Sequence, residues 1–213
     1  MNISTVFRDF FTHTKELTKT TQKFEFRFSD APWSESHGFS KKNEGAALYY
    51  LAVGRSLDAK SILVIGSGAG FVPKIYLENL KNLESLVLVD AFIPETGNGS
   101  PFDVRTKDKR DYPYIVKNRR KLTVFKVLSK SFFFFAIEKE LKFDLIFIDG
   151  DHSISGFSSD LENALLCMAP SGGIIFHDTQ IEHIRQIADQ KLDQRWVDLQ
   201  IGAGAGLYLG KRI

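Results

Sequence analysis

Short apolar runs alternate with amphipathic segments along most of this chain. The runs have the length of buried strands, and the segments between them carry apolar residues at helical spacing. The predicted strands cover residues 61–66, 86–90, 122–128, 143–149, 173–177, 196–201 and 206–211. The predicted helices between them cover residues 71–81, 132–141, 157–168 and 180–191. Regular alternation of strand and helix predicts a mainly parallel sheet with helices on both faces.

The last two predicted strands are joined differently from the others. Residues 202–205 are Gly-Ala-Gly-Ala, which is too short for a helical crossover, so the flanking strands should be antiparallel neighbours. The predicted fold class is therefore α/β, a doubly wound seven-stranded sheet that is mainly parallel and ends in a C-terminal antiparallel hairpin. We expect residues 1–41 to form a helical and extended N-terminal extension and residues 42–213 to form the α/β domain.

Glycines crowd the turn after the first predicted strand. They occupy positions 66, 68 and 70, directly before a helical start at Phe71. Glycine adopts positive φ and leaves no side chain between backbone and ligand, so a strand–glycine–helix junction is typical of nucleotide sites. A dinucleotide fingerprint would need its third glycine at position 71. This spacing argues against an NAD-dependent oxidoreductase, which stays an alternative.

The second predicted strand ends in a carboxylate. Leu86–Val89 is apolar, and Asp90 follows 20 residues after Gly70. A carboxylate in this place can accept hydrogen bonds from the two hydroxyls of an adenosine ribose. Asp90 could instead start a loop or cap a helix.

Amino-acid composition tells more about the compartment and partners of the protein than about its reaction. The formal net charge of +2 over 213 residues gives no general argument for nucleic acid or acidic membranes as partners. With Cys167 as the only cysteine, no internal disulfide can form, and a reducing compartment fits. The N-terminus does not read as a signal peptide, and no apolar run reaches the roughly 18 residues that span a bilayer. We therefore expect a cytoplasmic protein with no membrane partner.

Ionisable side chains gather after two later strands. The fourth strand runs into Asp149-Gly150-Asp151-His152-Ser153, and the fifth runs into His177-Asp178-Thr179. Ligands of doubly wound sheets lie beyond the carboxyl ends of the strands, so three carboxylates and two imidazoles should surround one crevice. Desolvating so many ionisable groups is costly without a ligand.

Together these motifs resemble the class I S-adenosylmethionine-dependent methyltransferases. The G-x-G-x-G turn is similar to the first motif of that family, and the polar strand ends resemble its branch called methyltransferase domain 24, which is similar to macrocin-type and catechol-type O-methyltransferases. The likeness covers roughly residues 40–180 and implies S-adenosyl-L-methionine as the cofactor. The cofactor-binding residues that it implies are Gly66, Ser67, Gly68, Gly70, Asp90, Ala91, Ser129 and Asp149.

The resemblance also implies O-methylation of a small hydroxylated acceptor, with Asp149, His152 and Asp178 as catalytic candidates. His152 could act as the general base, because its ordinary pKa is nearest neutrality, or it could simply cap a turn. A divalent metal such as magnesium is a further alternative, with Asp149, His177 and Asp178 as ligands, although magnesium prefers oxygen donors. His177 and Asp178 could equally shape the loop by hydrogen bonding without an ion.

One position departs from the family pattern. Most class I members carry an acidic residue two positions before the first glycine, where this chain has Val64. A non-catalytic cofactor-binding protein of the same fold is therefore kept as an alternative. Eight basic residues in segment 105–121 would suit a phosphorylated or nucleotide-linked acceptor, or a solvated surface, and the low net charge argues against nucleic acid as the partner. An apolar N-terminal helix could pair two subunits in a homodimer.

Overall fold

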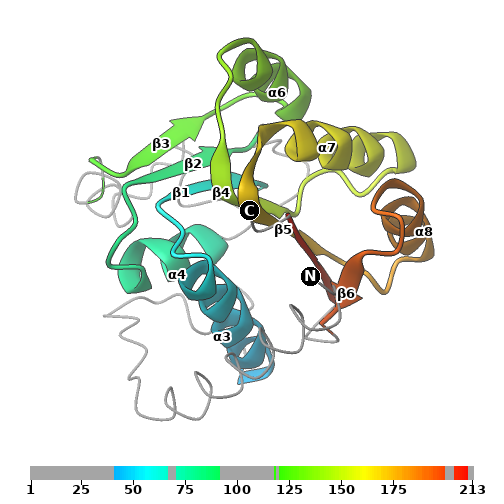
Figure 1. Cartoon of the computed structure of the whole chain (residues 1–213), viewed down its shortest axis with the longest axis horizontal. Helices are drawn as coiled ribbons and strands as arrows, with labels where there is room; N and C mark the ends of the chain where they lie inside the picture. The colour runs from blue at the N-terminus through cyan, green and yellow to red at the C-terminus, as the bar shows by residue number, and fades with distance from the viewer. Residues whose placement is uncertain (1–40, 67–70, 92–117, 119, 200–203, 211–213) are drawn as a thin grey trace.

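A seven-stranded sheet forms the centre of the protein (Figure 1). The computed structural model describes residues 41–66, 71–91, 118, 120–199 and 204–210. The strands are β1 (Ser61–Ile65), β2 (Ser85–Val89), β3 (Leu122–Phe125), β4 (Phe143–Ile148), β5 (Met168–His177), β6 (Trp196–Asp198) and β7 (Ala205–Leu209). Their order is β3-β2-β1-β4-β5-β7-β6; the pairs from β3 to β5 are parallel, and β7 is antiparallel to both of its neighbours. The predicted fold class is confirmed.

Helices cover both faces of this sheet (Figure 1). They are α3 (Lys41–Ser56), α4 (Phe71–Asn79), α6 (Ser129–Glu138), α7 (Ile154–Cys167) and α8 (Glu182–Lys191). The helices α3 and α4 pack over one core cluster, and α6, α7 and α8 pack over the other. Along β4, Leu145 and Phe147 belong to the first cluster, whereas Ile146 and Ile148 belong to the second. Burial on both faces explains why the strands read as continuous apolar runs. None of the helices in the described ranges is long and apolar enough to cross a membrane.

Several element boundaries differ from the predicted ones. The strand expected over 122–128 ends at Phe125, and α6 begins at Ser129 rather than at 132, because Leu128 takes the extended conformation of an N-cap residue. The strand expected from 173 starts at Met168, which pairs with Phe143 across a register shift. The expected N-terminal helix lies outside the described residues, and the division at residue 41 stays a prediction.

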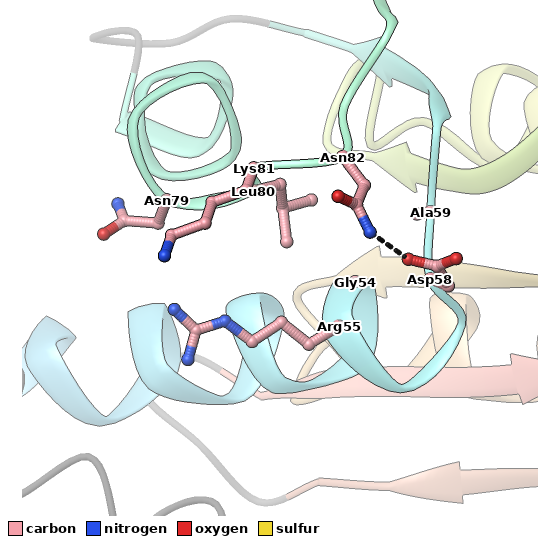
Figure 2. Close-up of a pocket in the computed structure, with 8 residues that line it drawn as sticks. All are labelled: Gly54, Arg55, Asp58, Ala59, Asn79, Leu80, Lys81 and Asn82. Carbon is pink, nitrogen blue, oxygen red and sulfur yellow. Dashed lines mark hydrogen bonds between the residues drawn. The ribbon is translucent and has the colours of Figure 1, made fainter.

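A surface pocket of about 370 Å³ lies at the amino-terminal edge of the sheet (Figure 2). Its walls come from the end of α3 and from the turn that follows α4, just before β1 and β2 begin. Asn82 donates a hydrogen bond from Nδ2 to Oδ1 of Asp58 across this wall, at 2.9 Å. The pocket is therefore on the opposite edge from the polar strand ends.

Candidate active site at the carboxyl ends of the strands

The parallel register aligns the residues that follow β2, β1 and β4 with the end of β5. The strand residues just before them are direct partners across the sheet. The aligned residues are Asp90, Gly66, Asp149 and His177. Side chains two positions apart on a strand point to the same face of the sheet. The residues two positions before these four all belong to the core cluster under α3 and α4. These four positions therefore form one row that faces the α3–α4 side.

Gly66 begins the predicted cofactor turn and lies directly against the start of the next loop. Its N–H donates to the carbonyl of Val89 at 2.8 Å, and its φ is +83°. A Cβ at this position would collide with the carbonyl oxygen of Asp149. The backbone therefore requires glycine here for both conformation and space. The other predicted residues of this turn, Ser67, Gly68 and Gly70, lie outside the described residues.

Asp149, His152 and Asp178 come together in the structure. His152 Nε2 lies 3.3 Å from Asp149 Oδ1 and 3.0 Å from Asp178 Oδ2. The ring of His183 contacts the same turn, with its Nε2 2.7 Å from the carbonyl oxygen of His152. The hydrogen bond with Asp149 raises the pKa of His152 above its ordinary value, and nearby negative charge adds to this, while burial opposes it. The imidazole thus favours its protonated form more than a free histidine does.

His177 borders this cluster through its Nδ1. Its Nδ1 lies 3.2 Å from Asp178 Oδ1 and 3.6 Å from Asp149 Oδ1. That nitrogen is buried and has no hydrogen-bond partner among the described residues. The two imidazoles therefore compete for the same two carboxylates.

A metal ion would find a mixed donor set here. Among the described residues, the potential ligand atoms of Asp149, His152 and Asp178 lie within 4.8 Å of one another. Two carboxylates and one imidazole suit a transition-metal ion better than magnesium, which prefers oxygen throughout. The histidine in this group is His152, whereas the set predicted from the sequence contained His177. His177 as a metal ligand stays a prediction.

The turn after β5 is held by contacts outside the cluster. Asp178 has a φ of +61°, an unusual value for a residue other than glycine, and its N–H donates to the carbonyl of Gly204 at 2.9 Å. Thr179 is buried, and its hydroxyl donates to Asp198 Oδ1 at 3.4 Å. Arg185 bonds the other oxygen of Asp198 at 2.6 Å. Because Thr179 is engaged there, Asp178 is the side chain that this turn presents to His152.

The remaining predicted residues lie at neighbouring strand ends. Asp90 and Ala91 follow β2 and are both half-buried, and the N–H of Asp90 donates to the carbonyl of Phe125 at 3.1 Å. Ser129 is the first residue of α6, and its side chain hydrogen-bonds to the buried carboxylate of Asp160. Ser129 is therefore already tied to α7.

Two buried polar residues near the site were not predicted as site residues. Asp160 is 2% exposed, and burial raises its pKa to about 6, although the hydrogen bond with Ser129 opposes this. The sequence does give one sign that Asp160 is buried, because it lies on the apolar face of a predicted helix. Tyr50 of α3 is also 2% exposed, and an aromatic residue on an apolar helix face gives no signal in the sequence.

Comparisons with known proteins agree with this geometry. Residues 63–179, more than half of the chain, match the family described as a methyltransferase domain. That range runs from β1 through the turn after β5, so it includes the whole cluster. No curated protein sequence gives a significant match.

Solved structures of methyltransferases share the fold. An O-methyltransferase from Bacillus cereus in complex with SAH is 17% identical, with a TM-score of 0.61 over 94% of this chain and 91% of that one. An SAH-bound methyltransferase from Podospora anserina is 14% identical, with a TM-score of 0.57 over 95% and 88%. A Staphylococcus aureus protein provisionally described as a caffeoyl-CoA O-methyltransferase is 12% identical, with a TM-score of 0.61 over 93% and 99%. The family match and the confirmed seven-stranded architecture agree: this chain belongs to the class I S-adenosylmethionine-dependent methyltransferases.

Proposed function

We propose that this methyltransferase transfers a methyl group to an oxygen of a small hydroxylated acceptor. The observation that carries the proposal is the cluster of Asp149, His152 and Asp178 beside the Gly66 turn. It puts an imidazole between two carboxylates at the strand ends, where doubly wound folds bind their ligands. The similar folds of proteins described as O-methyltransferases support it further.

The proposed cofactor site follows the row of strand ends. Gly66 would hold the methionine part together with Ser67, Gly68 and Gly70, and Asp149 would lie beside the methyl donor. Asp90 and Ala91 would hold the ribose, and Ser129 would border the adenine. Gly66 lets this turn pack directly on the backbone of Asp149, which brings the turn and the Asp149 loop together at the proposed site.

The proposed chemistry is an in-line displacement. The bound cofactor supplies a methyl group on a positively charged sulfur, and the acceptor oxygen must lose its proton as the new C–O bond forms. His152 Nε2 takes that proton, and Asp149 and Asp178 stabilise the resulting imidazolium at 3.3 and 3.0 Å. Alignment of the two reactants provides much of the acceleration.

The same carboxylates restrict when His152 can act as a base. They favour its protonated form, so a free base is more abundant at alkaline pH. A divalent ion held by Asp149, His152 and Asp178 would instead lower the pKa of an acceptor hydroxyl. Comparing rates with EDTA and with added Mn²⁺ or Mg²⁺ separates these two routes.

A direct transfer assay tests the proposal. The protein is incubated with S-adenosylmethionine and panels of catechols, sugars and oligonucleotides, and methylated products are identified by mass spectrometry. We expect O-methylated catechol or sugar products, with turnover at least about a hundredfold lower in His152→Gln. Asp151→Asn is the control for Asp149→Asn, because Asp151 Oδ1 accepts the N–H of Ser153 in the turn, at 2.9 Å. Products methylated only on nitrogen would refute O-specificity.

A non-catalytic cofactor-binding protein is the second candidate. Val64 is fully buried among apolar side chains, so it offers no polar group to a cofactor at the position where most relatives carry an acid. Thermal-shift titration separates the candidates when it is combined with the transfer assay. Stabilisation by S-adenosylhomocysteine without any turnover would favour this second function, and stabilisation by NAD alone would favour an oxidoreductase.

The cellular setting and assembly of the protein are also proposals. Cys167 is buried and unbridged, which suits a cytoplasmic protein, and cell fractionation tests this. Leu128 and Phe134, 61% and 75% exposed near the start of α6, would suit a homodimer interface, which light scattering tests. Expression of residues 42–213 alone tests whether residues 1–41 are a separable extension.

A further inference from the structure

Two tyrosine hydroxyls are buried without a partner on the α3–α4 side of the sheet. Tyr50 is 2% exposed and Tyr76 is fully buried. Neither hydroxyl has a hydrogen-bond partner among the described residues. An unpaired buried hydroxyl destabilises the free protein, so such a group is expected to have a use that the unliganded structure does not show.

Tyr50 lies beneath the row of strand ends. Its ring packs edge-on against Phe147, with ring centroids 4.9 Å apart and planes at 72°. Phe147 comes two residues before Asp149, and its centroid is 6.5 Å from that of His177. Burial raises the pKa of the Tyr50 hydroxyl, and the negative charges of Asp149 and then Asp178 raise it further. The hydroxyl is therefore close enough to the cluster to sense both carboxylates.

Tyr76 has the same chemistry but a different neighbourhood. Its Cε1 would be 3.3 Å from a Cβ at Gly54, one helical turn further along α3 than Tyr50. Burial raises the pKa of Tyr76, and the charge that adds to this comes from an ionised Tyr50 rather than from a carboxylate. Tyr76 thus lies deeper and beyond the reach of the cluster.

We propose that the Tyr50 hydroxyl accepts a hydrogen bond from the amino end of bound S-adenosylmethionine. This inference rests on the proposed cofactor site at the Gly66 turn, which touches Asp149 directly. Two carboxylates near the hydroxyl attract a cation and repel a ligand carboxylate. An alkylammonium carries three donors and no acceptor, so it can bond the tyrosine oxygen and the carboxylate of Asp149 together.

The first strand offers no acceptor side chain at the position where most relatives carry an acid. Val64 occupies the position two residues before Gly66, is fully buried and has no polar side-chain atom. Tyr50 of α3 approaches the strand-end row from this side, because its ring packs on Phe147, two residues before Asp149. Its hydroxyl is buried and has no hydrogen-bond partner among the described residues. Binding then removes the cost of the unpaired group.

Calorimetric titration of two ligands against three proteins tests the proposal. The ligands are S-adenosylhomocysteine, which keeps the amino acid end, and 5′-methylthioadenosine, which lacks it. The proteins are the wild type, Tyr50→Phe and Tyr76→Phe, and each substitution removes one unpaired oxygen without changing the ring. We expect Tyr50→Phe to bind S-adenosylhomocysteine about tenfold more weakly and 5′-methylthioadenosine unchanged, and Tyr76→Phe to bind both as the wild type does.

The other outcomes separate this inference from the proposed function. Equal binding of S-adenosylhomocysteine by Tyr50→Phe and the wild type overturns the role of Tyr50 and leaves the proposed function standing. Equal weakening of both ligands, or the same loss in Tyr76→Phe, also overturns it, because the effect would then be one of packing. If the wild type binds neither ligand, the proposed function itself fails. Melting temperatures of both variants should equal or exceed that of the wild type, since neither loses a hydrogen bond.

Discussion

Replacing Asp160 by asparagine should stabilise this protein at neutral pH. Asp160 of α7 is 2% exposed, accepts a hydrogen bond from Ser129, and leaves its second oxygen without a partner among the described residues. A Cβ at Gly150 would be 3.2 Å from that second oxygen, so the carboxylate lies under the turn that follows β4. The ionised form is thus desolvated and only half satisfied. Asparagine keeps the shape and can still accept the bond from Ser129.

The size and sign of the effect follow from the pKa. Burial raises the pKa of Asp160 from 3.8 to about 6, so the native state binds this proton more tightly than the unfolded chain does. Each pH unit of difference corresponds to about 1.4 kcal/mol, so the ionised carboxylate costs about 2–3 kcal/mol at pH 7. The stabilising contribution of the protonated acid is complete below about pH 3.8 and is lost as pH rises through about 6. Asparagine does not ionise, so Asp160→Asn should not lose this stability as the pH rises.

Urea unfolding at pH 7.5 and pH 4.5 measures both parts of this prediction. We expect Asp160→Asn to gain about 2–3 kcal/mol at pH 7.5 but only about 1 kcal/mol at pH 4.5, where the native carboxyl is still mostly protonated and the unfolded one is mostly ionised. Asp144→Asn is the matched control, because Asp144 Oδ2 accepts the N–H groups of Lys60 and Ser61, both at 2.9 Å, and should lose stability instead. Equal destabilisation of Asp160→Asn at both pH values would refute the reasoning, since the bond with Ser129 would then outweigh the cost of desolvation.

Three further predictions concern the strand ends. The wild-type kcat/KM should rise with pH through a His152 pKa above its ordinary value, whereas His152→Gln should show a lower rate without that rise, as a pH–rate profile would record. Gly66→Ala should lose at least about 2 kcal/mol of unfolding free energy in urea, because its φ is +83° and the new Cβ would collide with the carbonyl of Asp149; wild-type stability would contradict this. Arg185→Ala should lower stability by no more than about 1 kcal/mol, because the guanidinium that bonds Asp198 is half-exposed, but should reduce activity by loosening the turn after β5; unchanged turnover would argue against that coupling.

The architecture could be predicted from the sequence because most strands are buried on both faces. Such strands read as unbroken apolar runs, and the helices between them keep a helical period. The boundaries were harder where pairing rather than composition decides them. Residues 168–172 contain Pro170 and Gly172, which indicate a loop, yet Met168 pairs with Phe143 and extends β5. A strand partner that is distant in the chain cannot be inferred from the local sequence.

The candidate site was predictable in its place but not in all of its partners. The rule that ligands lie beyond strand ends placed Asp149 and Asp178 at one edge of the sheet, and in the structure both lie beside His152. The sequence could not decide which imidazole lies between them, because the backbone of the turn sets that choice, and His152 reaches both carboxylates. A role for Tyr50 could not be predicted from the sequence, because the argument for it rests on a buried hydroxyl without a hydrogen-bond partner, which only the folded structure shows.

Three of the buried side chains that have an unpaired polar atom lie near the carboxyl ends of the strands. Four buried side-chain atoms lack a hydrogen-bond partner among the described residues, and they belong to Tyr50, Tyr76, Asp160 and His177. His177 lies in the strand-end row, Tyr50 lies beneath that row, and Asp160 lies under the turn after β4. Tyr76 is the exception, because it lies against Gly54, further along α3.

The pocket at the amino-terminal edge shows the opposite pattern (Figure 2). Its Asn82 bonds Asp58 at 2.9 Å, and its Asn79 donates to the carbonyl of Ile75 at 2.9 Å. Polar groups that already have partners gain little from a ligand, whereas unpaired groups gain the full cost of their desolvation when a ligand satisfies them. Side chains left without local partners are expected where function requires them, which supports the proposal that the ligand binds at the carboxyl edge of the sheet.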